Sequence, residues 1–515
     1  MRVHAAFGRP VFVSLLAGIA ASSVAACGGG GGSQHVPAPP GGVISTPAPT
    51  ATPAATSTPN ASATSYTNDD WTTFAHDFAR TADGRADTGI STTSVARLAL
   101  RWKITIPGNP EIFASPVVYD GNVIVSTFAP PATIYDFSAA DGSLRWSFTM
   151  DDGSGQKTPT IDPANGLVFV GNARSGAAGI LPSTEYALRL LDGSLVWRQT
   201  IPGHARATDV VANGVVYTAS SGGDPPQCLN EGMFALDEAT GAVKWSWYVN
   251  AAKNPGGGGA IWGPVGFDGS HLIFGTGNTC NTPVTTSNGA AALDLDGHLL
   301  WSMVAQPNST LDYDTGSSVM VVNGRATFLN KNGLLYSVDA ATGANQRSIT
   351  ANPNYGYGFW SSPSSDGTVT VVESGAYAPG MPTSGALRVP AAGAIGGDRF
   401  CYTFRRTRAI EPGYTSLLKA FDTSGTLLWS APSQAIAPFY AAIDNGVVFA
   451  DIDSTLQAFD LHTGAKLWSY PTAGLLWAGP VVVPSGVYAA DGSGNVYAFA
   501  IPAPASSSAR ARPRR

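Results

Sequence analysis

A hairpin sequence that ends in tryptophan recurs along this chain and constrains its fold more than any other feature. The segments ALDEATGAVKW, ending at Trp245, and AFDLHTGAKLW, ending at Trp468, share the pattern Ala-x-Asp-x-x-Thr-Gly-x-x-x-Trp. Looser copies end at Trp146, Trp197, Trp301 and Trp429, one copy carries Arg347 in place of the tryptophan, and LALRW places Trp102 at the front. The chain therefore contains eight copies of one structural unit.

Each copy has the sequence of a β-hairpin. Alternating apolar residues lead into an aspartate, a Thr-Gly or Asp-Gly turn supplies the special backbone angles, and the next strand carries the tryptophan. Successive copies lie 44, 51, 48, 56, 46, 82 and 39 residues apart, which corresponds to one four-stranded blade per interval with an insertion before Trp429. We predict an all-β fold, a single eight-bladed β-propeller of four-stranded antiparallel blades, over residues 67–502.

The last strand-like segment, GNVYAFA at residues 494–500, has no tryptophan after it. We expect it to pair beside the strand that carries Trp102. This pairing would close the ring and leave no long sheet edge open.

The composition agrees with short strands and tight turns. Charged residues make up 12%, and the chain holds 60 Gly and 37 Pro, a mixture that does not favour amphipathic helices. The net charge of −6 gives no sign of a nucleic-acid surface, because the basic residues cluster only in the tail. We expect residues 503–515 to be a disordered basic tail and the protein to be a monomer.

The first residues have the features of an export signal. Arg2 and Arg9 supply positive charge, residues 11–20 are apolar, and small residues lead to VAAC at 24–27. This segment resembles a bacterial lipobox, which implies that residues 1–27 are a lipoprotein signal peptide and that Cys27 carries the lipid. Ordinary secretion with cleavage nearby is the alternative.

The residue after Cys27 is Gly28, not Asp. In lipoproteins of this kind, that implies the outer membrane of a Gram-negative cell. We expect a cell-envelope protein whose Cys27 lipid inserts in the bilayer, facing the periplasm or the cell surface. Residues 28–66 are Gly, Pro, Thr and Ala rich and are expected to form a disordered tether.

The repeats resemble the PQQ (pyrroloquinoline quinone) repeat, which also builds propellers that hold no quinone, such as the lipoprotein of the outer-membrane β-barrel assembly machine. Four segments resemble quinoprotein alcohol dehydrogenases and polyvinyl-alcohol dehydrogenase-like proteins more specifically. They are WTTFAHDFARTADGRADTGISTTSVARLALRW at 71–102, GGGGAIWGP at 256–264 followed by HLIFGTGNTCN, LDYDTGSS at 311–318, and LNKNGLLYSVDAATG at 329–343. Their order and spacing agree with that family.

The resemblance implies a PQQ site with Ca²⁺ at the centre of the propeller. By motif, Trp262 would be the stacking floor, Asn278 a Ca²⁺ ligand, Asp312 the general base and Lys331 the cation that bonds the quinone oxygens. Ca²⁺ prefers hard oxygen donors such as an asparagine carbonyl and carboxylates. The structural alternatives are a tryptophan that fills a blade core, an asparagine in a left-handed turn, a solvated loop aspartate and an exposed lysine.

The sequence departs from the family pattern at the metal site and the substrate pocket. Where the family supplies an acidic Ca²⁺ ligand, this chain has SGGDPPQCLNEG, which offers Asp224 as a poorly aligned ligand and Glu231 as a worse one. Leu311 stands where the family has Trp. The cysteines are isolated, so the vicinal disulfide of many alcohol dehydrogenases cannot form.

Cys228 and Cys280 lie in two long connections that flank the same blade. In an oxidising envelope they could form a disulfide that stabilises loops on the site face, and Cys401 would remain free or pair differently. No Cys-x-x-Cys-His occurs. We therefore expect no attached haem and, for an enzyme, a separate electron acceptor.

Two functions stay open at this point. The first is a PQQ-dependent dehydrogenase that oxidises an alcohol. The second is a non-catalytic envelope propeller that acts as a protein-binding scaffold of the outer-membrane assembly type. The Trp motif itself predicts only the fold, so the choice depends on the few residues of the central site.

Overall fold

The computed structural model describes residues 70–84, 88–176, 179–222, 228–251, 257–280, 284–306, 314–351, 361–377, 414–433, 440–452 and 454–502. All described residues belong to one compact unit. The predictions for Cys27, the tether, the tail and Cys401 lie outside the described residues, and the predicted domain boundaries there stay predictions.

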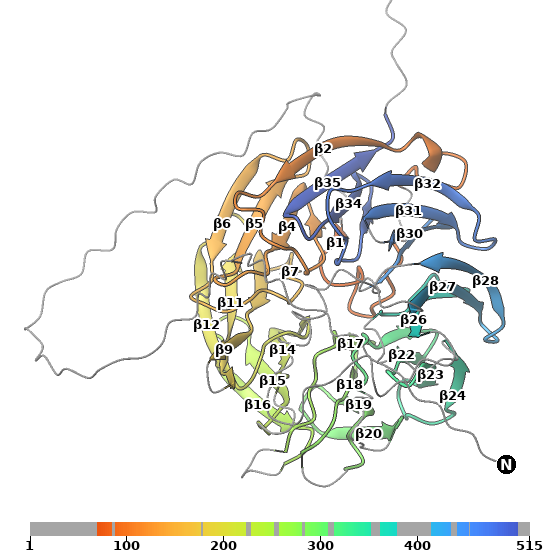
Figure 1. Cartoon of the computed structure of the whole chain (residues 1–515). Helices are drawn as coiled ribbons and strands as arrows, with labels where there is room; N and C mark the ends of the chain where they lie inside the picture. Colours follow the sequence, from red (N-terminus) through yellow and green to blue (C-terminus); the bar gives the residue numbers. More distant parts are fainter. Residues whose placement is uncertain are drawn as a thin grey trace, which may run out of the picture. The chain divides into compact units, whose positions relative to one another are not determined.

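Eight antiparallel blades surround a common centre, which confirms the predicted eight-bladed propeller (Figure 1). In blades 1–4 the strands, from the centre outwards, are as follows. Blade 1 holds β3 (Val117–Tyr119), β4 (Asn122–Ser126), β5 (Thr133–Ser138) and β6 (Leu144–Thr149), with β1 (Asp70–Trp71) added inside; blade 2 holds β7 (Thr160–Asp162), β8 (Leu167–Gly171), β11 (Ser183–Arg189) and β12 (Leu195–Ile201); blade 3 holds β13 (Val210–Ala212), β14 (Val215–Ala219), β15 (Gly232–Asp237) and β16 (Val243–Tyr248); blade 4 holds β17 (Gly266–Phe267), β18 (Leu272–Gly275), β19 (Gly289–Leu293) and β20 (Leu299–Val304).

The remaining blades repeat this order. Blade 5 holds β21 (Met320–Val322), β22 (Arg325–Leu329), β23 (Leu334–Asp339) and β24 (Arg347–Thr350); blade 6 holds β25 (Ser364–Ser365), β26 (Val369–Tyr377), β27 (Tyr414–Asp422) and β28 (Leu427–Ser433); blade 7 holds β29 (Ala442–Asp444), β30 (Val447–Ile452), β31 (Thr455–Asp460) and β32 (Lys466–Pro471); blade 8 holds β33 (Val481–Val483), β34 (Gly486–Ala490), β35 (Asn495–Ala500) and β2 (Ala99–Thr105). A small hairpin, β9 (Arg174–Gly176) and β10 (Gly179–Leu181), extends from blade 2, and a 3-10 turn, η1, covers Val95–Arg97. No helix within the described residues could span a membrane.

The ring closes where the sequence predicts. Strand β2, from the start of the propeller, pairs antiparallel with the terminal strand β35, and Trp102 lies opposite Ala498. The indole of Trp468 in blade 7 then donates a 3.0 Å hydrogen bond to the backbone carbonyl of Leu98, just before β2. Blade 8 is therefore shared by both ends of the propeller.

The motif tryptophans join seven of the eight blades to the next one. In blade 1, the Trp146 Nε1–H donates to the carbonyl of Leu190 at 2.9 Å, in the hairpin turn of blade 2. Gly193 of that turn has φ +68°, and a Cβ there would lie 2.4 Å from the Trp146 ring, so the turn requires glycine for two reasons. The equivalent indole–carbonyl bonds join Trp102 to Ala139, Trp197 to Glu238, Trp245 to Leu295, Trp301 to Ala340 and Trp429 to Leu461.

Blade 5 uses a different contact, because Arg347 replaces its tryptophan. Here the side chain of Ile349 takes the position against the next turn, and a Cβ on Gly425 would lie 2.8 Å from Ile349. An aliphatic residue from the same strand thus fills part of the space that an indole fills elsewhere.

Residues 71–84, which we call the hub segment, run along the inner edges of the blades. The backbone N–H groups of innermost strands donate to hub carbonyls: Ile161 to Thr72, Phe267 to Phe78, Val321 to Ala79, Ser365 to Thr81 and Ile443 to Ala82. Strand β1 pairs with β3 of blade 1. The hub therefore provides hydrogen-bond acceptors to edge strands that face the centre of the ring.

A buried ion cluster joins blades 2 and 3 close to the hub. Lys157 Nζ lies 2.7 Å from Glu185 Oε2, 2.5 Å from Asp209 Oδ1 and 3.1 Å from Thr218 Oγ1. The three charged side chains are fully buried. Burial, together with the charge of Asp209, raises the pKa of Glu185 to about 8.

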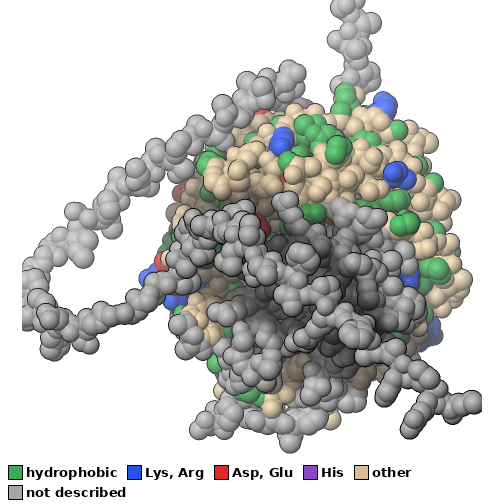
Figure 2. Space-filling model, in the orientation of Figure 1, with side chains coloured by type: hydrophobic (Ala, Val, Ile, Leu, Met, Phe, Trp, Pro, Cys, Tyr) green, Lys and Arg blue, Asp and Glu red, His purple; other side chains and the backbone are tan. Residues whose placement is uncertain are grey.

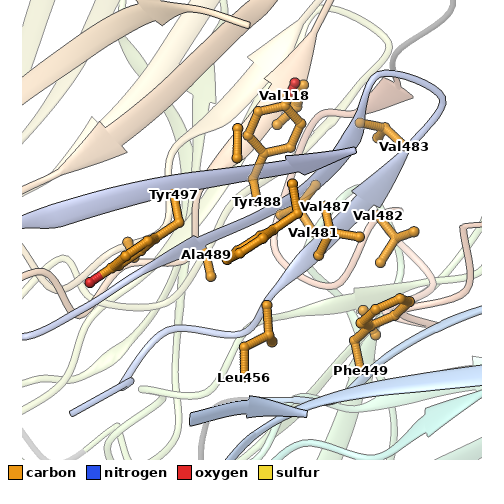
Figure 3. Close-up of a cluster of buried hydrophobic side chains, with 14 of the residues drawn as sticks. Val118, Phe449, Leu456, Val481, Val482, Val483, Val487, Tyr488, Ala489 and Tyr497 are labelled. Atoms are coloured by element: carbon orange, nitrogen blue, oxygen red, sulfur yellow. The ribbon is translucent and has the colours of Figure 1, made fainter. Parts of the chain in front are cut away.

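The largest hydrophobic cluster packs blade 8 between its neighbours. Figure 3 shows Val481, Val487 and Tyr488 of blade 8 beside Phe449 and Leu456 of blade 7. On the outside, Lys and Arg side chains are scattered among polar ones (Figure 2). Several outer strands also expose the apolar residue two places before the motif tryptophan, as in Leu144 and Leu195. Apolar side chains exposed singly like this are common in soluble proteins.

Candidate functional site

The segments singled out in the sequence meet at one end of the propeller. Asn278 and Lys331 follow the second strands of blades 4 and 5, β18 and β22, whereas Trp262 and Asp314 precede the innermost strands β17 and β21. Because the first and second strands of a blade are antiparallel, the start of one and the end of the other lie at the same edge. We call this end of the propeller the site face.

The buried carboxylate of Asp314 is the centre of this group. Its Oδ1 accepts hydrogen bonds from the backbone N–H of Asn278 at 3.0 Å and from the side-chain Nδ2 at 3.1 Å. Its Oδ2 lies 3.4 Å from Lys331 Nζ, and the Lys331 backbone N–H donates to the Asp314 carbonyl at 3.1 Å. Two residues predicted from the sequence therefore contact one carboxylate.

Trp262 completes the group. The Lys331 ammonium lies 4.7 Å from the centre of the Trp262 ring, within the range of a cation–π interaction. The ring also packs closely on Gly316, where a Cβ would lie 2.3 Å from ring atom Cζ2. The indole is only partly buried, so it does not simply fill a blade core, and Lys331 is buried instead of exposed.

The side chain of Asn278 is oriented from both sides. Its Oδ1 accepts a 2.8 Å hydrogen bond from Asn288 Nδ2, while its amide donates to Asp314. Asn288 has the left-handed φ of +48°, whereas Asn278 is not among the residues with positive φ. Asn278 therefore has contacts beyond those that a turn residue needs.

Asp312 and Asp224 lie outside the described residues, so their predicted roles stay predictions. Glu231, the weaker candidate for a metal ligand, is fully buried just before β15. Sequence reasoning missed Asp314 and Asn288. The signal for Asp314 was present, because it is the second aspartate of the same LDYD segment.

A disulfide joins Cys228 to Cys280, with the Cα atoms 5.7 Å apart and 52 positions between them in the sequence. Cys228 follows β14 in blade 3, and Cys280 follows β18 in blade 4. The bond therefore connects loops of adjacent blades at the site face.

One group elsewhere has the geometry of a metal site, namely Asp294, Asp296 and His298. The Asp294 carboxylate accepts hydrogen bonds from the backbone N–H groups of Asp296 and His298. These contacts are those of an aspartate in a hairpin turn, which accounts for the cluster without a metal.

Comparison with known families agrees with the repeats. The PQQ_2 model, described as outer membrane protein assembly factor BamB, matches residues 184–377 and 390–502. The chain belongs to the PQQ_2 family. Membership confirms the predicted resemblance to quinoprotein repeats and, as with the Trp motif, leaves the activity open.

Relatives with curated names fall into two groups. The chain is 24% identical over 305 residues to quinohemoprotein alcohol dehydrogenase ADH-IIG of Pseudomonas putida, covering 49% of this chain and 42% of the relative. It is 25% identical over 334 residues to quinohemoprotein alcohol dehydrogenase of Comamonas testosteroni, covering 53% and 45%. BamB of Yersinia pestis is 24% identical over 168 residues, covering 30% and 37%. The chain thus spans less than half the length of these relatives.

Solved structures support the fold. Quinohemoprotein alcohol dehydrogenase from Comamonas testosteroni matches with a TM-score of 0.68 at 18% identity, covering 86% of this chain and 82% of that one. A europium-containing methanol dehydrogenase gives 0.62 at 16% identity, covering 82% and 89%. BamB from Moraxella catarrhalis gives 0.50 at 15% identity, covering 78% and 97%.

Proposed function

We propose that this protein is an exported PQQ-dependent dehydrogenase that oxidises an alcohol at the site face. The observation that carries the proposal is that Asn278 and Lys331 both contact the buried carboxylate of Asp314, while the Lys331 ammonium lies against the ring of Trp262. These residues come from separate segments, and the contacts among them are not needed to build a blade.

The residues suit the proposed cofactor. A flat quinone could stack on the partly exposed Trp262 ring, and Lys331 already holds a positive charge against that ring. The carboxylate of Asp314 and the amide oxygen of Asn278 are hard donors of the type that Ca²⁺ takes. Bound PQQ would accept the two electrons of the alcohol, with the metal polarising its carbonyl.

Each protein residue has a distinct task in this proposal. Lys331 would hold the quinone oxygens, Asp314 and Asn278 would hold the metal, and Asp224 would add a further carboxylate ligand. Asp312 would accept the proton of the alcohol. Asp314 supplies an acidic ligand in a region where the sequence alone left the metal site incomplete.

We place the protein in the cell envelope. The export signal, the expected lipid on Cys27 and the similarity to proteins named outer membrane assembly factors support this location. Because the chain has no Cys-x-x-Cys-His motif, the electrons would pass to a separate acceptor.

A scaffold function is the second candidate. The description of the matching family model and two of the similar proteins favour it, since all three are named for outer-membrane assembly. In that case the loops of the site face would contact a protein partner, and PQQ would have no role.

Reconstitution decides between the two. Purified protein would be titrated with PQQ in the presence of Ca²⁺, and in parallel Eu³⁺, followed by quinone absorbance, calorimetry and dye reduction with alcohols. We expect saturable binding that weakens at least 10-fold in Trp262→Ala and Lys331→Ala and is unchanged in Lys244→Ala, an exposed residue paired with Asp237. No binding by folded protein at saturating PQQ would reject the enzyme and favour the scaffold.

A further inference from the structure

The glycines at 257–259 have a structural role next to the Cys228–Cys280 disulfide. The Gly258 N–H donates to the carbonyl of Leu229 at 2.9 Å, and the Cys280 N–H donates to the carbonyl of Gly257 at 2.9 Å. Gly258 and Thr279 also form an antiparallel bridge. The glycine segment is thus held between the two loops that the disulfide joins.

Only glycine fits at positions 258 and 259. A Cβ on Gly258 would lie 3.0 Å from the Cys280 sulfur, and one on Gly259 would lie 2.4 Å from Val249 Cγ1; both residues have positive φ. The run therefore allows close approach of three backbone segments. This need explains the repeated glycines without a phosphate ligand.

The same hydrogen bonds continue into the candidate site. The Ile261 N–H, next to Trp262, donates to the carbonyl of Ser220 at 3.1 Å, and the Gly277 N–H, next to Asn278, donates to the carbonyl of Ala260 at 2.9 Å. The segment before β17 that carries Trp262 and the turn that carries Asn278 are therefore joined by a backbone hydrogen bond. Asn278 lies two positions before Cys280, and Gly257, five positions before Trp262, accepts the hydrogen bond of the Cys280 N–H.

We propose that the Cys228–Cys280 disulfide is a positioning element, which holds Trp262 and Asn278 at the spacing that quinone and metal binding require. This inference rests on the proposed function for its ligand and on the hydrogen bonds above for its geometry. The motif tryptophans and the hydrophobic clusters lie in the blades, so the propeller should remain folded when the disulfide is opened. The site, in contrast, should loosen.

The test compares the oxidised full-length protein with the double variant Cys228→Ser/Cys280→Ser. Hydrogen exchange without ligand reports on the amides of Gly258, Ile261 and Gly277, and calorimetry reports on PQQ affinity with Ca²⁺ present. We expect at least 10-fold faster exchange at these amides and about 10-fold weaker PQQ binding, with unchanged exchange in β8. Exchange and affinity within twofold of the parent protein would overturn the inference.

Two controls separate positioning from general loss of stability. Val168→Ala, in the core of blade 2, is used under conditions that match its melting temperature to that of the double variant, and it should keep PQQ affinity. Mild reduction of the parent protein should weaken PQQ binding reversibly, whereas the double variant should not respond to reductant. A response of the double variant equal to that of the parent would contradict the proposal.

The same measurements distinguish a failure of the proposed PQQ binding from a failure of the proposed positioning role of the disulfide. If the parent protein binds no PQQ, the proposed function fails, and the exchange measurement alone decides the positioning role. Faster exchange confined to residues 257–262 and 276–280 would then support positioning of these segments. Unchanged exchange there would reject it.

Discussion

Arg80 Nη2 donates a 2.8 Å hydrogen bond to the backbone carbonyl of Asp209, 129 positions further along the chain. Its Nε donates to the carbonyl of Val265 at 2.7 Å, and its Nη1 to Thr73 Oγ1 at 2.8 Å. One fully buried guanidinium therefore joins the hub segment to the innermost strands of blades 3 and 4. Arginine suits this position because its fixed, planar donors can reach several acceptors at once.

We predict that Arg80→Met strongly destabilises the propeller. Methionine fills part of the space of the arginine side chain, but it leaves the buried carbonyl groups without hydrogen-bond donors. Breaking a buried charged network of this kind lowers the free energy of unfolding by about 3–5 kcal/mol. Urea unfolding followed by tryptophan fluorescence would measure this loss. The matched control is Arg198→Met, whose exposed partner is Asp151; we expect a change below about 1 kcal/mol. Equal effects would contradict the role of the hub.

Asp136 is a buried residue whose replacement should stabilise the protein, in contrast to the replacement of Arg80. It lies opposite Trp146 in its blade, at the position where Ala187, Ala235 and Ala458 face their own tryptophans. Its side chain is fully buried, and this burial raises its pKa from 3.8 to about 7. The folded state therefore retains a proton that the unfolded chain releases between these pH values, so stability falls as pH rises through this window.

We predict that Asp136→Ala, which restores the repeat residue, stabilises the protein above pH 7 and has little effect near pH 4. At about 1.4 kcal/mol per pKa unit, the gain is at most about 4 kcal/mol. Urea titrations at both pH values would measure it. Asp141→Ala is the control: Ser143 hydrogen bonds lower the pKa of Asp141, so this exposed change should cost about 1 kcal/mol or less, and the cost should shrink as pH falls. A pH-independent effect of Asp136→Ala would be the contrary result.

The blades could be predicted from the sequence, because each repeat is a local pattern. The hydrogen bonds of the hub segment could not be predicted, because they join residues far apart in the chain. The Asp, turn glycine and Trp of each repeat are local neighbours, so one hairpin pattern predicts the strand pairing and the docking of Trp146 on blade 2. Arg80 acts through backbone carbonyls as far as 185 positions away. Backbone acceptors leave no signal in the side-chain sequence, so nothing in the repeats indicates which residues the arginine contacts.

Only part of the candidate site could be predicted from the sequence, because a motif does not specify the local backbone path. Motif resemblance indicated Trp262, Asn278 and Lys331; in the structure Asn278 and Lys331 contact one carboxylate, and Trp262 contacts Lys331. The carboxylate itself, Asp314, was not predicted, because the family motif assigns a role only to the first aspartate of the segment LDYD. Which of two aspartates two places apart turns towards Asn278 depends on the local backbone path, which the motif does not specify.

Lys157 offers a test of the cluster between blades 2 and 3. We predict that Lys157→Met costs about 3–5 kcal/mol at pH 7, because it leaves the Asp209 carboxylate buried without its cation. Glu185 loses the same partner, and burial together with the charge of Asp209 already raises its pKa to about 8. Lys244→Met, at an exposed pair, should change stability by less than about 1 kcal/mol in the same urea titrations.

The two aspartates of the LDYD segment should separate metal binding from catalysis. Asp314→Asn keeps the shape of the side chain but removes its charge beside Asn278 and Lys331, so we expect at least 10-fold weaker Ca²⁺ binding and correspondingly weaker PQQ binding. Asp312→Asn should leave both affinities within about threefold and reduce alcohol-dependent dye reduction by 100-fold or more, because general base catalysis contributes about 10²–10⁴-fold. Calorimetry and single-turnover quinone absorbance would measure the two effects separately. If instead Asp312→Asn abolished metal binding and Asp314→Asn spared it, the roles would be exchanged, and Asp314 would be a structural partner of Lys331 without direct contact to the metal.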